Sequence, residues 1–241
     1  MPSASGLLRV SIVIPARNEA DSIGLVCADL FKVIPQLEDC VCEVVCVDDH
    51  STDRTAEIAA SFGARVVRNL GPSGKGRALR AGFEAAAGDV IVMMDADYSH
   101  RAEDLPAMLA PLASGAGGLV IGSRLMGGSD EFTRVRALGN LFLTAVFGLC
   151  HERYLTDALN GYKAFRRDVF TDFQYTSNSF EIEIELLVNA LRKGYRLVEV
   201  SSHERERHGG EPKSRVIRHG TRFLWRILWE KMRRPVIVRK G

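Results

Sequence analysis

The sequence predicts an α/β fold with a mostly parallel central sheet. Short runs of apolar and β-branched residues recur along the first half of the chain, and helical stretches separate them. Each run is apolar throughout rather than alternating, which is typical of strands that helices bury on both faces. The expected strands span residues 9–15, 42–49, 88–97 and 117–124, with 64–69 as a weaker candidate. In an open sheet of this type, ligands bind beyond the carboxyl ends of the strands.

The second half of the chain is expected to add helices and a loop as well as two further strands. Apolar residues between Val135 and Leu149 predict a helix. The other expected elements are a strand at 161–166, a helix at 180–192 that Gly194 ends, a strand at 195–200, a polar loop at 201–214 and a last helix to about residue 234. Because no repeat or low-complexity linker divides the chain, the sequence predicts one domain.

The composition is that of a folded protein, and the distribution of charge limits the kinds of partner that the protein can bind. Of the 241 residues, 46% are hydrophobic and 26% are charged, which excludes disorder, collagen and a small disulfide scaffold. The formal net charge of +2 argues against a nucleic-acid partner. The charge is uneven: residues 203–241 hold 12 basic and 4 acidic side chains, whereas residues 1–202 hold 20 and 26. The basic tail predicts either a solvated helix end or a surface for phosphates or anionic lipid.

Cysteine usage and hydropathy predict a cytoplasmic protein. The five cysteines are an odd number, and no His or Cys follows them at zinc-ligand spacing. The N-terminal sequence lacks the apolar core of a signal peptide. The longest apolar stretch, 137–150, is interrupted by Asn140 and Thr144 and is shorter than the roughly 20 residues that span a bilayer. We therefore expect no signal peptide and no transmembrane helix.

Two carboxylates close the third expected strand. Asp95 and Asp97 are separated by one residue, so both can turn to one side as the chain leaves the sheet. Carboxylates placed in this way suit Mg²⁺ or Mn²⁺, with substrate phosphates completing the shell of the metal. The alternative is a structural turn in which an aspartate caps the next helix.

Polar residues after the other strands belong to the same edge of the sheet. Asp48 and Asp49 repel each other unless donors surround them, and a nucleotide could supply such donors. Arg17 and Glu19 follow the first strand. The loop at 71–77 lacks the spacing and the Ser or Thr of an ATP-binding P-loop, but its Lys75 could reach a phosphate.

The motifs in this order resemble those of a known family. The segments SIVIPARNEA, VCVDDHSTDRT, GKGRALRAG, VMMDADYSH, IGSR and TDALNGYKAFRR look like those of the inverting family 2 glycosyltransferases of GT-A fold. They are most similar to the polyprenyl-phosphate (dolichol-phosphate) mannosyl- and glucosyltransferases. The resemblance implies one GT-A domain over residues 1–241, with a nucleotide-sugar-binding half at 1–124, an acceptor half at 125–214 and a basic amphipathic helix and tail at 215–241.

The resemblance also implies roles for individual residues. Nucleotide-sugar contacts would come from Pro15, Arg17, Glu19, Val47, Asp49, Lys75, Asp95, Ala96 and Asp97, with Asp95 and Asp97 as metal ligands. The acceptor phosphate would meet Arg124, Arg134 or Arg136, Arg205 or Arg207, and Lys213. Two positions depart from the family pattern: Ser99 stands where many members have a Gln, and Arg17 replaces a common Tyr. Ser99 leaves open whether the protein supplies a third ligand for the metal. Arg17 could change which nucleotide the protein prefers.

The acceptor decides the expected mechanism. A sugar hydroxyl needs a carboxylate base, whereas a lipid phosphate is already ionised and needs cations to bring two anions together. Asp97, Arg124 and Asp157 are the candidate catalytic residues. Asp157 is the best candidate base if one exists, and the alternative is a turn cap before Gly161. Glutamates at 181, 183 and 185 are expected in part to orient cations.

The last helix bears on membrane attachment. Arg215, Arg218, Arg222 and Arg226 form one basic stripe, while Trp225, Trp229 and neighbouring aliphatic residues form an apolar side. Such a helix can lie in a lipid headgroup layer, or its apolar side can pack on the sheet. The stretch 138–149 is a second apolar candidate. Peripheral attachment to the cytoplasmic membrane face is therefore expected.

The sequence as a whole predicts a metal-assisted, inverting hexosyltransferase. We expect a nucleotide sugar as donor, GDP-mannose first and UDP-glucose next, and a polyprenyl phosphate as acceptor. One alternative is a transferase of the same fold that acts on a hydroxyl of a soluble or glycan acceptor. The other is a nucleotide-sugar-binding protein without turnover, which the Ser99 departure suggests.

Overall fold

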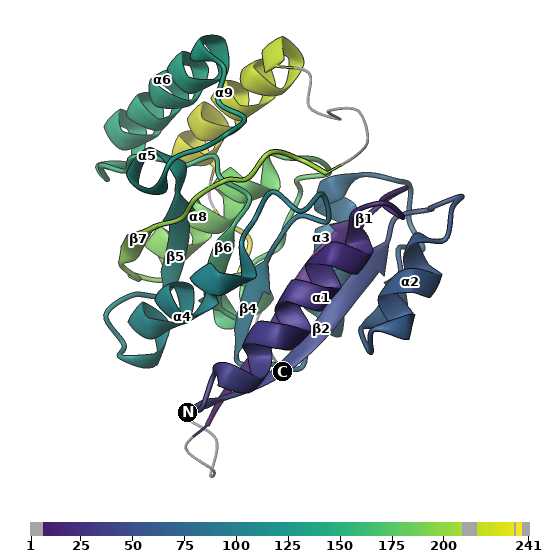
Figure 1. The fold of residues 1–241 in the computed structure, drawn as a ribbon. Helices are drawn as coiled ribbons and strands as arrows, with labels where there is room; N and C mark the ends of the chain where they lie inside the picture. The colour runs from purple at the N-terminus through teal and green to yellow at the C-terminus, as the bar shows by residue number, and fades with distance from the viewer. Residues whose placement is uncertain (1–6, 209–215, 234, 238–241) are drawn as a thin grey trace.

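A seven-stranded sheet forms the centre of the molecule (Figure 1). The computed structural model describes residues 7–208, 216–233 and 235–237. The strand order is β3-β2-β1-β4-β6-β5-β7. The strands are β1 (Leu8–Ala16), β2 (Cys40–Asp48), β3 (Arg65–Arg68), β4 (Val90–Met93), β5 (Leu119–Ser123), β6 (Lys163–Arg166) and β7 (Leu197–Ser201). Every strand expected from the sequence is present, including the weaker candidate at β3.

The sheet is mostly parallel, as predicted. Only β6 runs against its neighbours, because it is inserted between β4 and β5 and pairs antiparallel with both. The other neighbouring strands pair in parallel. The register pairs Ala16 with Asp48, so β1 and β2 end at the same level and the polar residues after them meet at one edge.

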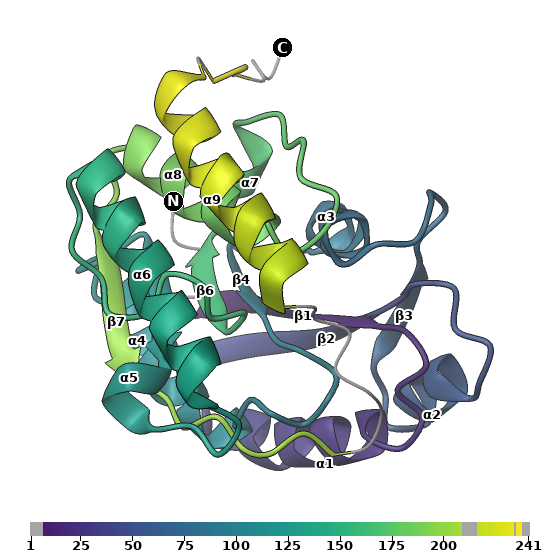
Figure 2. The same ribbon diagram turned by 90° about the horizontal axis from the view of Figure 1, so that it is seen from above.

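Helices cover both faces of the sheet. They are α1 (Ile23–Val33), α2 (Thr55–Ser61), α3 (Lys75–Ala85), α4 (Leu105–Ala113), α5 (Arg124–Gly127), α6 (Arg134–His151), α7 (Asp168–Thr171), α8 (Ile182–Arg192) and α9 (Val216–Met232), with short 3-10 turns at Ile34–Gln36 and Ala102–Asp104. Side chains of α1, α2 and α4 share one core layer with alternate residues of the strands. Those of α3, α6, α8 and α9 share the other layer (Figure 2).

Helices α6 and α9 lie side by side over the sheet (Figure 2). Phe223 and Ile227 of α9 are buried in the core, and Arg226 reaches Glu185 of α8 and Glu230 of its own helix. The alternative in which the apolar side packs on the sheet is therefore realised by these residues, while other apolar side chains of α6 and α9 face outward. These exposed residues are Val135, Leu138, Leu141, Phe142, Leu149, Trp225, Leu228, Trp229 and Met232. Arg215 lies outside the described residues, as do the side chains at 216–218.

Across the part of the chain that the structure describes, no helix combines the length and the apolar content needed to cross a bilayer.

Candidate active site

Two adjoining pockets lie at the carboxyl ends of the parallel strands. The first, here the β1–β2 pocket, has a volume of about 310 Å³ and is lined by residues that follow β1, β2 and β4. The second, here the α6–α9 pocket, has a volume of about 230 Å³ and reaches between α6 and α9. The residues that line both pockets are Lys75, Asp95, Asp97, Phe180, Arg207 and His219. The two expected carboxylates therefore stand at the junction of two compartments.

Strained turns shape this edge of the sheet. Asn18, His50 and Tyr98 have positive φ angles of 51°, 62° and 69°, and each lies shortly after β1, β2 or β4. A non-glycine residue in this region costs of order 1–3 kcal/mol, and such residues gather at functional sites. The Asn18 side chain accepts a hydrogen bond from the Thr52 N–H at 2.8 Å, which ties the first turn to the second.

Asp49 finds its donors within the protein. Its carboxylate accepts hydrogen bonds from Asn69 Nδ2 at 2.6 Å, Ser73 Oγ at 2.8 Å and the Gly74 N–H at 2.9 Å. The sequence suggested that a nucleotide would supply such donors. In this structure the buried Asp49 instead shapes the loop that leads into α3, and that loop forms one wall of the β1–β2 pocket.

Most of the other expected nucleotide contacts line this pocket. Pro15, Arg17, Glu19 and Ala96 are lining residues, and Arg17 Nη1 donates to Ser73 Oγ at 2.8 Å. Val47 is the exception, because it is fully buried beneath α3, where a Cβ on Gly82 would come within 2.7 Å of Val47 Cγ2. Val47 lines neither pocket, so its expected nucleotide contact stays a prediction.

Asp95 and Asp97 each face a cation of the protein. Asp95 Oδ1 lies 2.7 Å from Lys75 Nζ, which is also 3.1 Å from Glu183 Oε1. Burial opposes ionisation of Asp95, but the charge of Lys75 outweighs it and lowers the pKa of Asp95 to about 2. Burial likewise opposes the charge of Lys75, and the two carboxylates outweigh it, so its pKa is raised. Asp97 Oδ2 lies 2.7 Å from Arg207 Nη2.

The donor set fits a divalent cation that substrate phosphates help to bind. Both carboxylates are hard oxygen ligands and face the shared space of the pockets. A Cβ on Gly161 would come within 3.0 Å of Asp95 Oδ2 and 3.2 Å of Lys75 Nζ, so a larger residue there would push these two side chains aside. Ser99 Oγ donates to Asp97 Oδ1 at 2.6 Å. Among the described residues no third His, Cys, Asp or Glu completes a metal cluster.

A buried network holds the Asp95 turn. His100 Nδ1 accepts from the Asp95 N–H at 3.1 Å, which assigns the ring proton to Nε2 and lets it donate to Asn160 Oδ1 at 3.2 Å. Asn160 Nδ2 donates to the Gly122 carbonyl, and Lys163 Nζ donates to the Asn160 carbonyl. Sequence reasoning missed His100 and Lys163 as site residues, although both lie inside the motifs that it singled out.

Arg124 lines the α6–α9 pocket, and the buried Asp157 supports it from behind. Arg124 Nε and Nη2 donate to the two oxygens of Asp157 at 2.7 and 2.9 Å, and Asn140 Nδ2 donates to Oδ1 at 2.9 Å. Asp157 is fully buried, yet its pKa is lowered, because hydrogen bonds and the charge of Arg124 outweigh the burial. Arg124 Nη1 also lies 3.2 Å from Glu204 Oε1.

The structure separates the paired arginine candidates. Arg136 lines the α6–α9 pocket, with Nη1 at 3.1 Å from Glu131 Oε2, whereas Arg134 is exposed and lines neither pocket. Arg207 lines both pockets, whereas Arg205 turns away to Asp29 and Glu103 at 2.9 and 3.0 Å. Lys213 lies outside the described residues.

The fold and this site define a nucleotide-sugar transferase, and comparisons with known proteins agree. The Glycosyl transferase family 2 profile matches residues 11–173, and the chain belongs to that family. The chain is 34% identical over 200 residues to a dolichyl-phosphate hexose transferase of Haloferax volcanii, covering 83% of this chain and 84% of the relative. It is 31% identical over 235 residues to a dolichol-phosphate mannosyltransferase of Pyrococcus furiosus, covering 92% of this chain and 65% of the relative.

Solved structures share the architecture. Glucosyl-3-phosphoglycerate synthase from Mycobacterium tuberculosis, in complex with Mn²⁺, uridine diphosphate and phosphoglyceric acid, superposes with a TM-score of 0.73 at 25% identity. The superposition covers 93% of this chain and 78% of the synthase. The same synthase with uridine diphosphate alone gives a TM-score of 0.74 at 26% identity, covering 93% and 80%. The chain therefore has the expected GT-A fold.

Proposed function

We propose that this glycosyltransferase moves a hexose, mannose first and glucose next, from a nucleotide sugar to a polyprenyl phosphate with inversion. One observation carries the proposal: three arginines line the α6–α9 pocket, while the candidate base Asp157 is buried behind Arg124 with both oxygens hydrogen-bonded. The carboxylates that line the same pocket are each paired with a lysine or arginine of the protein. Such a pocket suits an acceptor that arrives as an anion rather than a hydroxyl that must lose a proton.

The donor would occupy the β1–β2 pocket. Its nucleoside would lie against the strand-end residues Pro15, Arg17 and Glu19, and its diphosphate would reach the junction at Asp95 and Asp97. A divalent cation held by these two carboxylates would neutralise the departing diphosphate. Lys75 stands at the same junction and supplies a fixed positive charge. GDP and UDP are both compatible with this pocket, and we place a mannose donor first because one relative is named a dolichol-phosphate mannosyltransferase.

The acceptor phosphate would occupy the α6–α9 pocket. Arg124, Arg136 and Arg207 would hold it so that a phosphate oxyanion attacks the anomeric carbon in line. A new bond from the anomeric carbon to phosphate oxygen forms while the bond to the nucleoside diphosphate breaks, which inverts the anomeric centre. In this arrangement Asp157 is a positioning residue that orients Arg124, and it does not act as the base.

The exposed face of α6 and α9 supports a position on the membrane. Apolar side chains of both helices point outward, and the α6–α9 pocket reaches between them. A polyprenyl chain could therefore stay in the lipid while its phosphate enters the pocket. We infer peripheral attachment on the cytoplasmic face, where nucleotide sugars would be available to the β1–β2 pocket.

A soluble acceptor is the second candidate. The structural likeness to a synthase bound to phosphoglyceric acid favours it, because that ligand also carries a phosphate. In the form expected from sequence, with a hydroxyl acceptor and Asp157 as base, the candidate conflicts with the occupied oxygens of Asp157. A binding protein without turnover would retain the nucleotide but have no need for the three acceptor-side arginines.

A donor-by-acceptor matrix tests the proposal. Radiolabelled GDP-mannose, UDP-glucose and other nucleotide sugars are incubated with a short polyprenyl phosphate or with phosphoglyceric acid, with Mn²⁺ or with chelator. We expect organic-extractable label that depends on the polyprenyl phosphate and on Mn²⁺. Label found only in water-soluble product would contradict the lipid acceptor, and the absence of any product would contradict an enzyme.

A further inference from the structure

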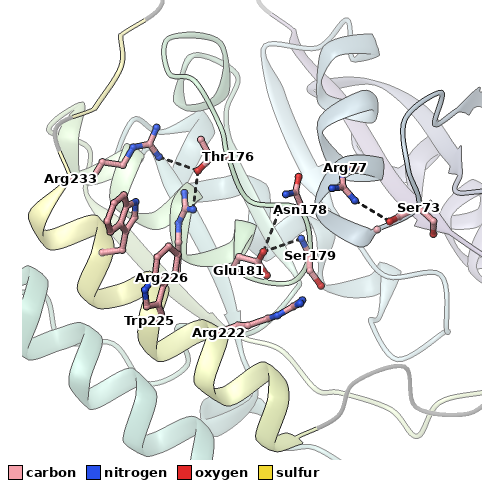
Figure 3. A pocket seen from close by; sticks show the side chains of 12 residues that line it. Ser73, Arg77, Thr176, Asn178, Ser179, Glu181, Arg222, Trp225, Arg226 and Arg233 are labelled. Atoms are coloured by element: carbon pink, nitrogen blue, oxygen red, sulfur yellow. Dashed lines mark hydrogen bonds between the residues drawn. The ribbon is translucent and has the colours of Figure 1, made fainter.

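A third cavity lies on the opposite side of α9 from the α6–α9 pocket. It has a volume of about 820 Å³ and lies between α9, the start of α3 and the segment 176–181 (Figure 3). The helix divides its side chains between the two cavities: His219, Gly220 and Phe223 line the α6–α9 pocket. The α9 residues that line the third cavity are Arg222, Trp225, Arg226 and Trp229, followed by Arg233. We call this cavity the arginine–tryptophan pocket.

Two of the arginines that line the arginine–tryptophan pocket form ion pairs with glutamates of the protein. Arg226 is buried and reaches Glu185 and, at 2.6 Å, Glu230. Arg233 Nη1 lies 3.2 Å from Glu185 and donates to Thr176 Oγ1 at 3.2 Å. These ion pairs fasten α9 to α8.

Two further arginines of the pocket have no carboxylate partner among the described residues. Arg222 is exposed and Arg77 is half-buried, and neither forms an ion pair with a carboxylate of the residues that the structure describes. The single contact shown for Arg77 is a 3.3 Å hydrogen bond to the Ser73 carbonyl (Figure 3). Glu181 also lines the cavity, but its Oε1 accepts from the N–H groups of Asn178 and Ser179, and its Oε2 is buried. The accessible charge of the pocket is therefore positive.

The aromatic side of the pocket faces solvent. Trp225 and Trp229 stack at 5.2 Å with their rings 13° apart, and they remain 57% and 42% exposed. Exposed tryptophan beside arginine is the composition of a surface that meets lipid headgroups, where an apolar ring and a cation are both favoured. The exposed apolar residues of α6 and α9 continue from this rim.

We propose that the arginine–tryptophan pocket binds the phosphate of an anionic membrane lipid that is not the acceptor. Arg77 and Arg222 would hold the phosphate, and the stacked tryptophans would enter the headgroup layer beside it. This inference rests on the proposed docking of α6 and α9 on a bilayer. The bound anionic lipid would fix the orientation of the protein on the membrane. The α6–α9 pocket, on the other side of α9, would then open toward the bilayer that holds the acceptor.

Intrinsic fluorescence gives a direct test, because both tryptophans of the sequence line this pocket. The protein is titrated with phosphatidylcholine vesicles, with vesicles that also contain phosphatidylglycerol, and with soluble glycerol phosphate. We expect a blue shift, and quenching by brominated acyl chains, at much lower lipid concentration when phosphatidylglycerol is present. If soluble glycerol phosphate alone gave the same change, the proposal that the phosphate belongs to a lipid would be contradicted. If vesicles with and without phosphatidylglycerol bound equally well, the proposed site itself would be contradicted.

Matched variants separate a defined site from general attraction. Replacing both free arginines, Arg77→Gln with Arg222→Gln, should lower the preference for phosphatidylglycerol roughly 10-fold or more. The control Lys231→Gln with Arg153→Gln also removes two exposed charges, both outside the pocket, and should lower the preference clearly less than the double variant does. Equal losses in the double variant and the control would contradict a defined site.

Turnover is measured separately, with a short-chain polyprenyl phosphate and without vesicles. We expect the double variant to retain the turnover of the unmodified protein in this assay. If neither the unmodified protein nor the double variant transfers sugar, the proposed function is wrong. The vesicle-binding assay still tests the proposed lipid-binding site in that case. A selective loss of turnover in the double variant would contradict the inference, because the pocket would then serve catalysis.

Discussion

Arg124 and Asp157 meet in a two-bond ion pair at 2.7 and 2.9 Å, and Asp157 has no exposed surface. A base must reach the proton that it removes, and among the described residues the Asp157 carboxylate accepts hydrogen bonds from the Arg124 side chain, the Arg124 main-chain N–H and Asn140. The pair instead holds a guanidinium that remains 14% exposed at the wall of the α6–α9 pocket. The carboxylate expected from sequence to be a base therefore has the geometry of a support for a cation.

A double-mutant cycle distinguishes these roles. If Asp157 acts through Arg124, Asp157→Asn and Arg124→Gln should each lower turnover, and the double variant should lose no more than Arg124→Gln alone. Asp157→Asn should also cost about 3 kcal/mol of unfolding free energy, because it weakens the pairing of a buried charge. Steady-state kinetics and urea unfolding measure the two effects. Multiplicative losses in turnover would instead support an independent role, such as a base.

Arg207 and a metal ion should compete for Asp97. Arg207 Nη2 lies 2.7 Å from Asp97 Oδ2, so removing its charge should strengthen Mn²⁺ binding in the presence of nucleoside diphosphate. We expect Arg207→Gln to tighten it about 5-fold, the size of a modest ion pair, while turnover falls. Calorimetry measures the affinity, and Arg205→Gln is the control because Arg205 pairs away from the site. Unchanged or weaker Mn²⁺ binding in Arg207→Gln would refute the competition.

Lys163 should make stability depend on pH above neutrality. Burial lowers its pKa from 10.5 to about 8, although the charges of Glu183 and Asp157 oppose that shift. Between about pH 8 and 10.5 the unfolded chain therefore holds more protons than the folded one, and the free energy of unfolding rises with pH. Relative to Lys163→Met, the unmodified protein should gain about 3 kcal/mol between pH 7 and pH 10.5. Urea unfolding of both proteins checks this, and a constant difference would show that Lys163 is solvated.

Gly76 should be sensitive to the smallest substitution. A Cβ there would come within 2.7 Å of the Asn178 carbonyl carbon and the Ser179 oxygen, which are backbone atoms that cannot easily move. Gly76→Ala should therefore lower the melting temperature and cost about 2 kcal/mol or more. Gly24→Ala in α1 is the matched control, since its Cβ would make an ordinary 3.4 Å contact with Ile58 Cγ2 of α2. It should stabilise the protein by about 0.5–1 kcal/mol. Equal effects at both positions would contradict the close approach at Gly76.

The strands and their polar ends were predictable from sequence because they depend on local order. Apolar runs predict buried strands, and the parallel register then brings Arg17, Asp49 and Asp95 to one edge. The fold class and the strand positions followed from these patterns, and the family from the resemblance of the motifs at the strand ends. The antiparallel insertion of β6 between β4 and β5 did not, because pairing between distant strands depends on how the whole sheet assembles.

Side-chain directions within the site depended on partners far along the chain. Sequence alone left Arg134 and Arg136 equivalent, and likewise Arg205 and Arg207, because each pair is two residues apart on a short segment. Tertiary packing turned Arg205 toward Asp29, 176 residues away, and Arg207 toward Asp97.

Apolar runs and turn residues along the chain set which residue types gather at the edge of the sheet. Packing between distant elements set which of those residues face the pockets. It buried Val47, closed Asp157 against Arg124, and placed Glu183 beside Lys75 across 108 residues. The physical reason is that a buried charge must find an opposite charge or a hydrogen-bond donor, and the available partner is set by packing between elements rather than by neighbours in sequence.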